Sequence, residues 1–286
     1  MTGSDASGGG YSLSGVTRAT YGAAVTYDYE TIMNAGYAVP DDLPGAVAAM
    51  SADLRSPDPG LRDGKAYAVL ATWIGRGVLD APAMAALGDE MAGRFADPEI
   101  QARTFAPLIL DCVVSQGVLR PEWTAAFAAW FAAEEDLRGK DPELGWLHAV
   151  AHGADLLGTI AGHPEGDPVA MLELGAARLV APTEFVWRDM EDERLSLALT
   201  RALVRPELSE AQATAWLAPV AALFAGRERI RPMPVVSNAM RTLRGVYVTV
   251  DRGPMGAGGE VPRVPHRAVV LDALADTMGV VWPFTG

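Results

Sequence analysis

The sequence of 286 residues contains a single cysteine, Cys112, and only two lysines among its 23 basic residues. One cysteine excludes an intramolecular disulfide framework and any zinc cluster built from several cysteines. Such low cysteine usage is typical of a reducing compartment, so we expect a cytoplasmic location. The other basic residues are arginines, and together with the frequent alanines they indicate a GC-rich bacterial genome.

Positive charge is scarce, because 36 acidic residues against 23 basic ones give a formal net charge of −13. Proteins bind nucleic acids and acidic membranes mainly through basic surfaces. The basic residues cluster only at residues 227–231. We therefore expect neither a nucleic acid nor a membrane as a partner.

Long apolar runs are also missing. The longest, at residues 213–226, has about 14 residues, whereas a membrane-spanning helix needs about 20. The first 20 residues lack the basic start and the apolar segment of a signal peptide. Their glycine and serine content predicts a flexible leader. We therefore divide the chain into a leader and N-terminal segment, residues 1–36, and a single helical-repeat domain, residues 37–286.

Strand patterns are almost absent from residue 41 onward, and prolines and capping residues recur where helices would begin. Alternate helices are expected to start near residues 41, 81, 121, 167 and 209, and their partners near residues 59, 98, 141, 188 and 233. The period of about 40 to 47 residues is typical of HEAT-like or armadillo-like arrays. We predict an all-α solenoid of about five helical pairs with a C-terminal capping helix near residues 265–281. An α/α toroid or bundle is the alternative, because the period does not distinguish these folds.

The segment at residues 145–158 carries the most informative polar residues. On a helical wheel His148, His152 and Asp155 fall within about 60° of one another. Asp155 is the only formally charged residue between residues 144 and 164, which is unusual for a face exposed to solvent. We therefore expect this face to line a concave groove or to contact a neighbouring helix.

Three interpretations of this face remain open. His148, His152 and Asp155 could supply three ligands to zinc or iron and leave one position for water. They could instead form an acid–base pair in which Asp155 fixes the tautomer of a histidine. The histidines could also be buried residues that hydrogen-bond to adjacent helices. No HExxH motif is present, so the spacing alone does not decide.

Further polar residues occur near the expected starts of the other partner helices. We expect Tyr67, Arg103 and Glu193 to meet the two histidines in one pocket. Asp63 and Arg103 could instead form a salt bridge between repeats. Acidic residues from Asp189 to Glu193 could simply complement a helix dipole. The full set of candidate ligand-binding residues is Asp63, Tyr67, Arg103, Trp146, His148, His152, Asp155, Glu193 and Arg194.

Four short motifs carry a family resemblance. They are Leu61-Arg62-Asp63 with Tyr67, Arg103-Thr104-Phe105 with Leu108-Ile109-Leu110, Gly-Trp-x-His-Ala-x-Ala-His-x-Ala-Asp from Gly145 to Asp155, and Glu193-Arg194-Leu195. With these motifs the chain resembles a bacterial family catalogued as domain of unknown function 2785, over about residues 37–283. The resemblance implies an all-helical fold and no established activity. The leader and the glycine-rich loop at residues 253–262 have no place in the family pattern.

The sequence contains no P-loop, no GxSxG elbow, no GxGxxG after a strand and no CxxC. Our leading hypothesis is a helical-repeat protein that binds a small molecule or a peptide in a polar concave groove. One alternative is a metal-dependent, hydrolase-like enzyme that uses zinc or iron at His148, His152 and Asp155. The other is a scaffold for protein–protein interaction.

Overall fold

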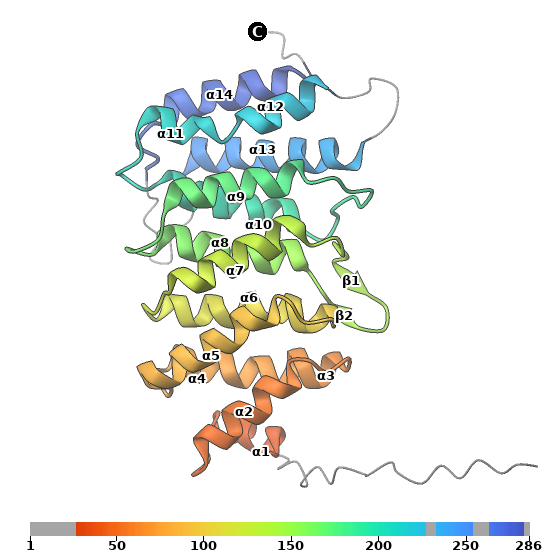
Figure 1. Ribbon diagram of the computed structural model, residues 1–286, viewed down its shortest axis with the longest axis vertical. Helices are drawn as coiled ribbons and strands as arrows, with labels where there is room; N and C mark the ends of the chain where they lie inside the picture. The colour runs from red at the N-terminus through yellow and green to blue at the C-terminus, as the bar shows by residue number, and fades with distance from the viewer. Residues whose placement is uncertain (1–26, 227–232, 254–262, 283–286) are drawn as a thin grey trace, which may run out of the picture.

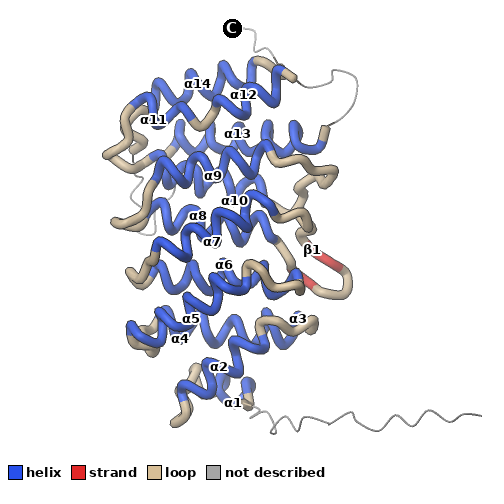
Figure 2. Tube along the Cα trace, in the orientation of Figure 1, coloured by secondary structure: helices blue, strands red, loops and turns tan. Residues whose placement is uncertain are grey.

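The computed structural model describes residues 27–226, 233–253 and 263–282, and this part of the chain is predominantly helical (Figure 1, Figure 2). The predicted all-α class is confirmed, with one two-stranded hairpin, β1 (Lys140–Asp141) and β2 (Gly145–Trp146), in the described residues. The helices are α1 (Tyr29–Asn34), α2 (Leu43–Asp53), α3 (Pro59–Leu61), the π-helical turn η1 (Arg62–Tyr67), α4 (Ala68–Gly75), α5 (Ala81–Arg94), α6 (Ile100–Ser115), α7 (Pro121–Ala133), α8 (Ala149–Gly162), α9 (Pro168–Val180), α10 (Glu191–Leu203), α11 (Glu210–Ala215), α12 (Ala218–Ala225), α13 (Pro234–Arg252) and α14 (Arg267–Gly279).

Several expectations concern residues outside this description. The glycine-rich leader up to residue 26, the basic cluster at 227–231 and the loop at 254–262 all lie there. Within the segment 1–36, α1 is described and contributes to the core: Tyr29 and Ile32 are buried, and Tyr29 Oη donates to the Asp53 carboxylate over 2.6 Å.

Capping residues begin several helices where the sequence predicts a start. The side chains of Asp42, Asp80 and Asp167 accept hydrogen bonds from backbone N–H groups in the first turns of α2, α5 and α9. Each of these helices has a proline at its first or second position, where the missing N–H group costs no helical hydrogen bond. Ser209 and Gln212 form a capping box at the start of α11, which satisfies two further N–H groups.

The expected helix start near residue 141 is wrong. The Asp141 carboxylate accepts hydrogen bonds from the N–H groups of Glu143 and Leu144, both over 2.9 Å, and this stabilises the turn between β1 and β2. The α8 helix begins only at Ala149. A hairpin therefore lengthens the connection between α7 and α8 (Figure 1).

The helices stack in chain order along the long axis of the molecule, in two layers (Figure 1). Each member of one layer, α4, α6, α8, α10 and α13, contacts the next, and we call this the α8 layer. In the other layer α5, α7, α9 and α12 contact one another in the same way. The α14 helix packs on α11, α12 and α13 at the C-terminal end.

No helix in the described residues combines the length and the apolar character that a membrane crossing requires.

The contact between α5 and α7 depends on Gly88. A Cβ atom at this position would collide with the Trp123 ring, which cannot move easily because its Nε1 donates to Asp89 over 2.7 Å. Gly93, on the same helix, has nothing within 4 Å of a Cβ atom. We expect Gly88→Ala to lower the free energy of unfolding by about 1–3 kcal/mol through overpacking. Gly93→Ala should raise it by about 0.4–1 kcal/mol, because it reduces the freedom of the unfolded chain.

Chemical denaturation followed by circular dichroism measures both effects. Changes of the same sign and size at the two glycines would contradict the described contact between α5 and α7.

Candidate functional site

His148 precedes α8 and is not part of it. The prediction that it shares a helical face with His152 and Asp155 is therefore wrong, and Trp146, in β2, is not helical either. The backbone of His148 is left-handed, with φ 51°. Its Nε2 lies 2.9 Å from the carbonyl oxygen of Asp189, in the loop before α10. Because a carbonyl group only accepts, Nε2 carries the proton in this arrangement.

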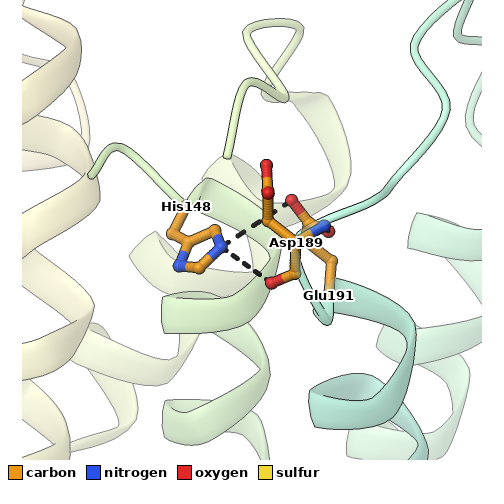
Figure 3. A group of neighbouring side chains, drawn as sticks. All are labelled: His148, Asp189 and Glu191. Carbon is orange, nitrogen blue, oxygen red and sulfur yellow. Dashed lines mark hydrogen bonds and ion pairs between the residues drawn. The ribbon is translucent and has the colours of Figure 1, made fainter. Parts of the chain in front are cut away.

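His148 faces two carboxylates at the start of α10 (Figure 3). Its Nε2 is 3.9 Å from Glu191 Oε1. One ring nitrogen of His148 and one carboxylate oxygen each of Asp189 and Glu191 all lie within 4.8 Å of one another. We call these three residues the His148 cluster. The side chain of Glu191 is only 1% exposed and that of His148 is 15% exposed. His148 and Glu191 are therefore largely shielded from water, whereas Asp189 is half-buried.

The backbone around the His148 cluster is strained. Met190, between its two acidic members, is left-handed with φ 68°, as His148 is with φ 51°. Each such residue costs roughly 1–3 kcal/mol, and strain of this kind is found preferentially at functional sites. Gly139, the residue before β1, packs directly against the cluster, since a Cβ atom there would collide with the carboxylates of Asp189 and Glu191.

Arg62 fixes the hairpin above the cluster. Its fully buried guanidinium donates to the carbonyl oxygens of Leu144 (2.6 Å), Trp146 (3.2 Å) and Ser56 (3.1 Å). Its Nε lies 2.7 Å from Asp63 Oδ1. The sequence motif contained Arg62, but our set of candidate residues omitted it.

The expected salt bridge between Asp63 and Arg103 is wrong. Asp63 pairs with Arg62, its neighbour in the chain. Arg103 instead binds the Glu134 carboxylate, with Nε 2.7 Å from Oε2, and donates to the Asp97 carbonyl over 2.8 Å. Arg103 therefore links α6 to the end of α7 and not to the π-helical turn.

A chain of ring contacts leads from the cluster into the α8 layer. Trp146, which is 40% exposed, stacks on His148 with centroids 4.4 Å apart. His148 meets the edge of His152 at 5.6 Å, and His152 contacts Phe105 at 5.5 Å. Phe105 in turn contacts Tyr67 at 6.1 Å. Three of the residues expected in one pocket, Tyr67, His148 and His152, are thus connected.

His152 matches the interpretation of a buried, hydrogen-bonded histidine. Its Nδ1 lies 2.9 Å from the Thr104 carbonyl oxygen and must donate to it. Burial is the main cause that lowers the pKa of His152 to about 3. The ring is therefore neutral at physiological pH.

Asp155 is engaged by Arg194 of α10 and is not directed to the histidines. Arg194 Nε lies 2.7 Å from Asp155 Oδ1, and a second nitrogen contacts Oδ2. The expected metal ligands His148, His152 and Asp155 are therefore divided among three different partners, the carbonyl groups of Asp189 and Thr104 and the Arg194 guanidinium.

Two further titratable groups, Tyr67 of η1 and Asp111 of α6, lie near this ion pair. Burial raises the pKa of Tyr67 to about 12, and the charges of Asp111 and Asp155 contribute to the rise. Burial also raises the pKa of the Asp111 carboxyl, Asp155 adds to the rise, and Thr159 opposes it. We call Tyr67, Asp111, Asp155 and Arg194 the polar face. Asp111 was not among the sequence candidates.

The remaining candidate, Glu193, lies beside Asp192 and Arg241, and a hydrogen bond with Asp192 is the main cause that raises its pKa. Like Arg103, Glu193 therefore has partners other than the aromatic and histidine rings that connect Trp146 to Tyr67.

Two pockets in the described part of the protein lie away from these residues. One, of about 400 Å³, is lined by Leu43, Val47, Leu79 and Leu87 of the α2–α5 region, and the other adjoins Gly253.

The fold and this site together define a predominantly helical protein. Its His148 cluster lies at the starts of two stacked helices, α8 and α10, and the hairpin packs next to it. The chain belongs to the family of proteins of unknown function DUF2785, whose model matches residues 92–248. This range includes the hairpin, the helices α6 to α12 and most of α13, but not Arg62 or Tyr67, so it is shorter than the range the sequence resemblance suggested. No curated protein and no solved structure matches the chain.

Proposed function

We propose that the protein is an α-solenoid that binds a small polar molecule or a peptide at the polar face. The solenoid is supported by the order of the contacts, since each helix of a layer packs on the next one in the chain. In a closed toroid the first and last helices would meet. Here α2 and α14 lie at opposite ends of the long axis (Figure 1).

The observation that carries the binding proposal is the placement of polar groups on two almost fully buried helices. On α8 every side chain is buried except Asp155 and Thr159, with Gly162 at the end. On α6 the partly accessible positions are Arg103, Asp111 and Cys112, apart from Ile100 and Ser115 at the two ends of the helix. Asp111 and Asp155 therefore present their carboxyl groups at the few places on α6 and α8 that a ligand can reach.

The polar face offers charge of both signs. Asp111 and Asp155 supply carboxyl groups, and Arg194 supplies a guanidinium that binds carboxylates in a two-pronged geometry. A ligand that carries both an amine and a carboxylate complements this set. Free amino acids and short peptides are the simplest ligands of that class.

Thermal unfolding in the presence of an amino-acid and dipeptide library tests the proposal. At a concentration of about 100 times Kd, a ligand stabilises the folded state by about 2.7 kcal/mol, which raises Tm by roughly 5 °C or more. Arg194→Gln should abolish the shift, because it removes the carboxylate-binding group.

Arg120→Gln is the matched control, because the Arg120 side chain is about as exposed as that of Arg194 and pairs with Asp89 of α5 over 2.7 Å from the residue before α7. It should leave the shift unchanged. A library without a single stabilising member, or a shift that persists in Arg194→Gln, would contradict the proposal.

A further inference from the structure

We infer that the His148 cluster is a site for a divalent transition-metal ion, with zinc the best-suited probe. The imidazole of His148 and the carboxylates of Asp189 and Glu191 would hold the ion. This set shares only His148 with the ligands expected from the sequence. It does not involve the polar face, so the inference goes beyond the proposed ligand binding.

The donor atoms suit such an ion in type and spacing. Zinc accepts imidazole nitrogen and carboxylate oxygen at about 2.0–2.2 Å, so two ligands of one ion lie roughly 3.3–3.5 Å apart. His148 Nε2 and Glu191 Oε1 are 3.9 Å apart, and the three donors lie within 4.8 Å of one another. Small side-chain rotations close these distances. Metal binding requires a free lone pair on Nε2, so the single proton of the neutral ring then resides on Nδ1.

A buried oxygen of Glu191 points to the ion independently of this spacing. Glu191 Oε2 accepts a hydrogen bond from the Asp189 N–H over 2.7 Å, but Oε1 has no hydrogen-bond partner within the described ranges. His148 Nε2, at 3.9 Å, is beyond hydrogen-bond distance. A buried carboxylate oxygen without a partner is costly, and a bound cation would supply that partner.

The partners of the two carboxylates in the described part of the chain also fit a cation site. Among the described residues, no lysine or arginine forms an ion pair with Asp189 or Glu191. The nearby Lys140 places its ammonium over the Trp146 ring, 5.6 Å from the centroid, and offers Asp189 only its backbone N–H, over 3.3 Å. The cluster therefore holds two carboxylates that have no lysine or arginine partner in the described part of the chain, and a divalent cation would supply the missing positive charge.

Zinc titration of the purified full chain by calorimetry, with metal content measured after dialysis, tests the inference. We expect one zinc ion per chain, and at least tenfold weaker binding in both Asp189→Asn and Glu191→Gln. The control is Glu210→Gln. Glu210 lies 3.8 Å from His266, so this pair has nearly the same spacing, but it belongs to no group of three possible metal ligands within the described residues. Zinc binding should be unchanged in this variant.

Zinc binding below one ion per chain, or equal affinity in wild type and Asp189→Asn, would overturn the inference. Asp189 is only half-buried, so this variant decides the matter if Glu191→Gln does not fold by circular dichroism. Loss of zinc in Asp155→Asn with full binding in Asp189→Asn would assign the ion to the sequence-predicted ligands and would also overturn it. Arg194→Gln should keep its zinc, which separates this result from the outcome of the ligand screen.

Discussion

Arg62→Met is expected to lower the free energy of unfolding by about 3–5 kcal/mol, as typical for breaking a buried charged pair. The guanidinium of Arg62 is fully buried, donates to three carbonyl groups and pairs with Asp63. Methionine fills a similar volume but leaves all these acceptors without a donor, and unsatisfied buried groups are the costly ones. The hairpin above the His148 cluster would lose its anchor in α3 and η1.

Urea denaturation followed by tryptophan fluorescence measures this loss. The control is Arg55→Met, which breaks a pair between the half-exposed Arg55 and Asp97 at 3.0 Å. Exposed pairs contribute about 0–1 kcal/mol, so the control should be nearly neutral. Similar losses in the two variants would contradict the anchoring role of Arg62.

The stability of the protein is expected to fall by about 2 kcal/mol between pH 7.5 and pH 5 because of His152 alone. An unfolded histidine has a pKa near 6.5, whereas burial lowers the pKa of His152 to about 3 in the folded protein. Below pH 6.5 the unfolded state therefore binds more protons at this residue than the folded state. The contribution is fully present above pH 6.5 and is lost as the pH falls toward 3.

His152→Asn should remove this part of the pH dependence, because asparagine does not titrate and its amide N–H can donate to the Thr104 carbonyl. Thr277→Ala, a change at a buried side chain that does not titrate, is the control and should keep the wild-type slope. Denaturation curves at half-unit pH steps measure the slope. Parallel profiles for wild type and His152→Asn would show that His152 is not held neutral by burial.

Much of the fold follows from local signals in the sequence. Aspartates before prolines predict the starts of α2, α5 and α9, because a capping carboxylate and a missing N–H group both act within one helical turn. The pair Asp141-Pro142 looks the same, yet Asp141 caps a hairpin turn. Arg62 binds the Leu144 carbonyl of this turn from 82 positions away. A local pattern carries no information on such a contact.

The candidate site was predictable only in part. The histidine motif identified the correct region, but a helical wheel assumes helical backbone, and His148 is left-handed. Asp189 and Glu191 were interpreted as helix-dipole residues, although Glu191 is buried against His148. One signal could have found them. His148 and Glu191 both stand at the starts of neighbouring helices of the α8 layer, so stacking brings them together.

A crystal structure of the full chain with the dipeptide or amino acid that gives the largest Tm shift tests the central claim most directly. The account predicts that the ligand lies on the polar face, with its carboxylate on Arg194 and its amine beside Asp111 or Asp155. Ligand density in the pocket lined by Leu43, Val47, Leu79 and Leu87, with the polar face unchanged, would contradict it.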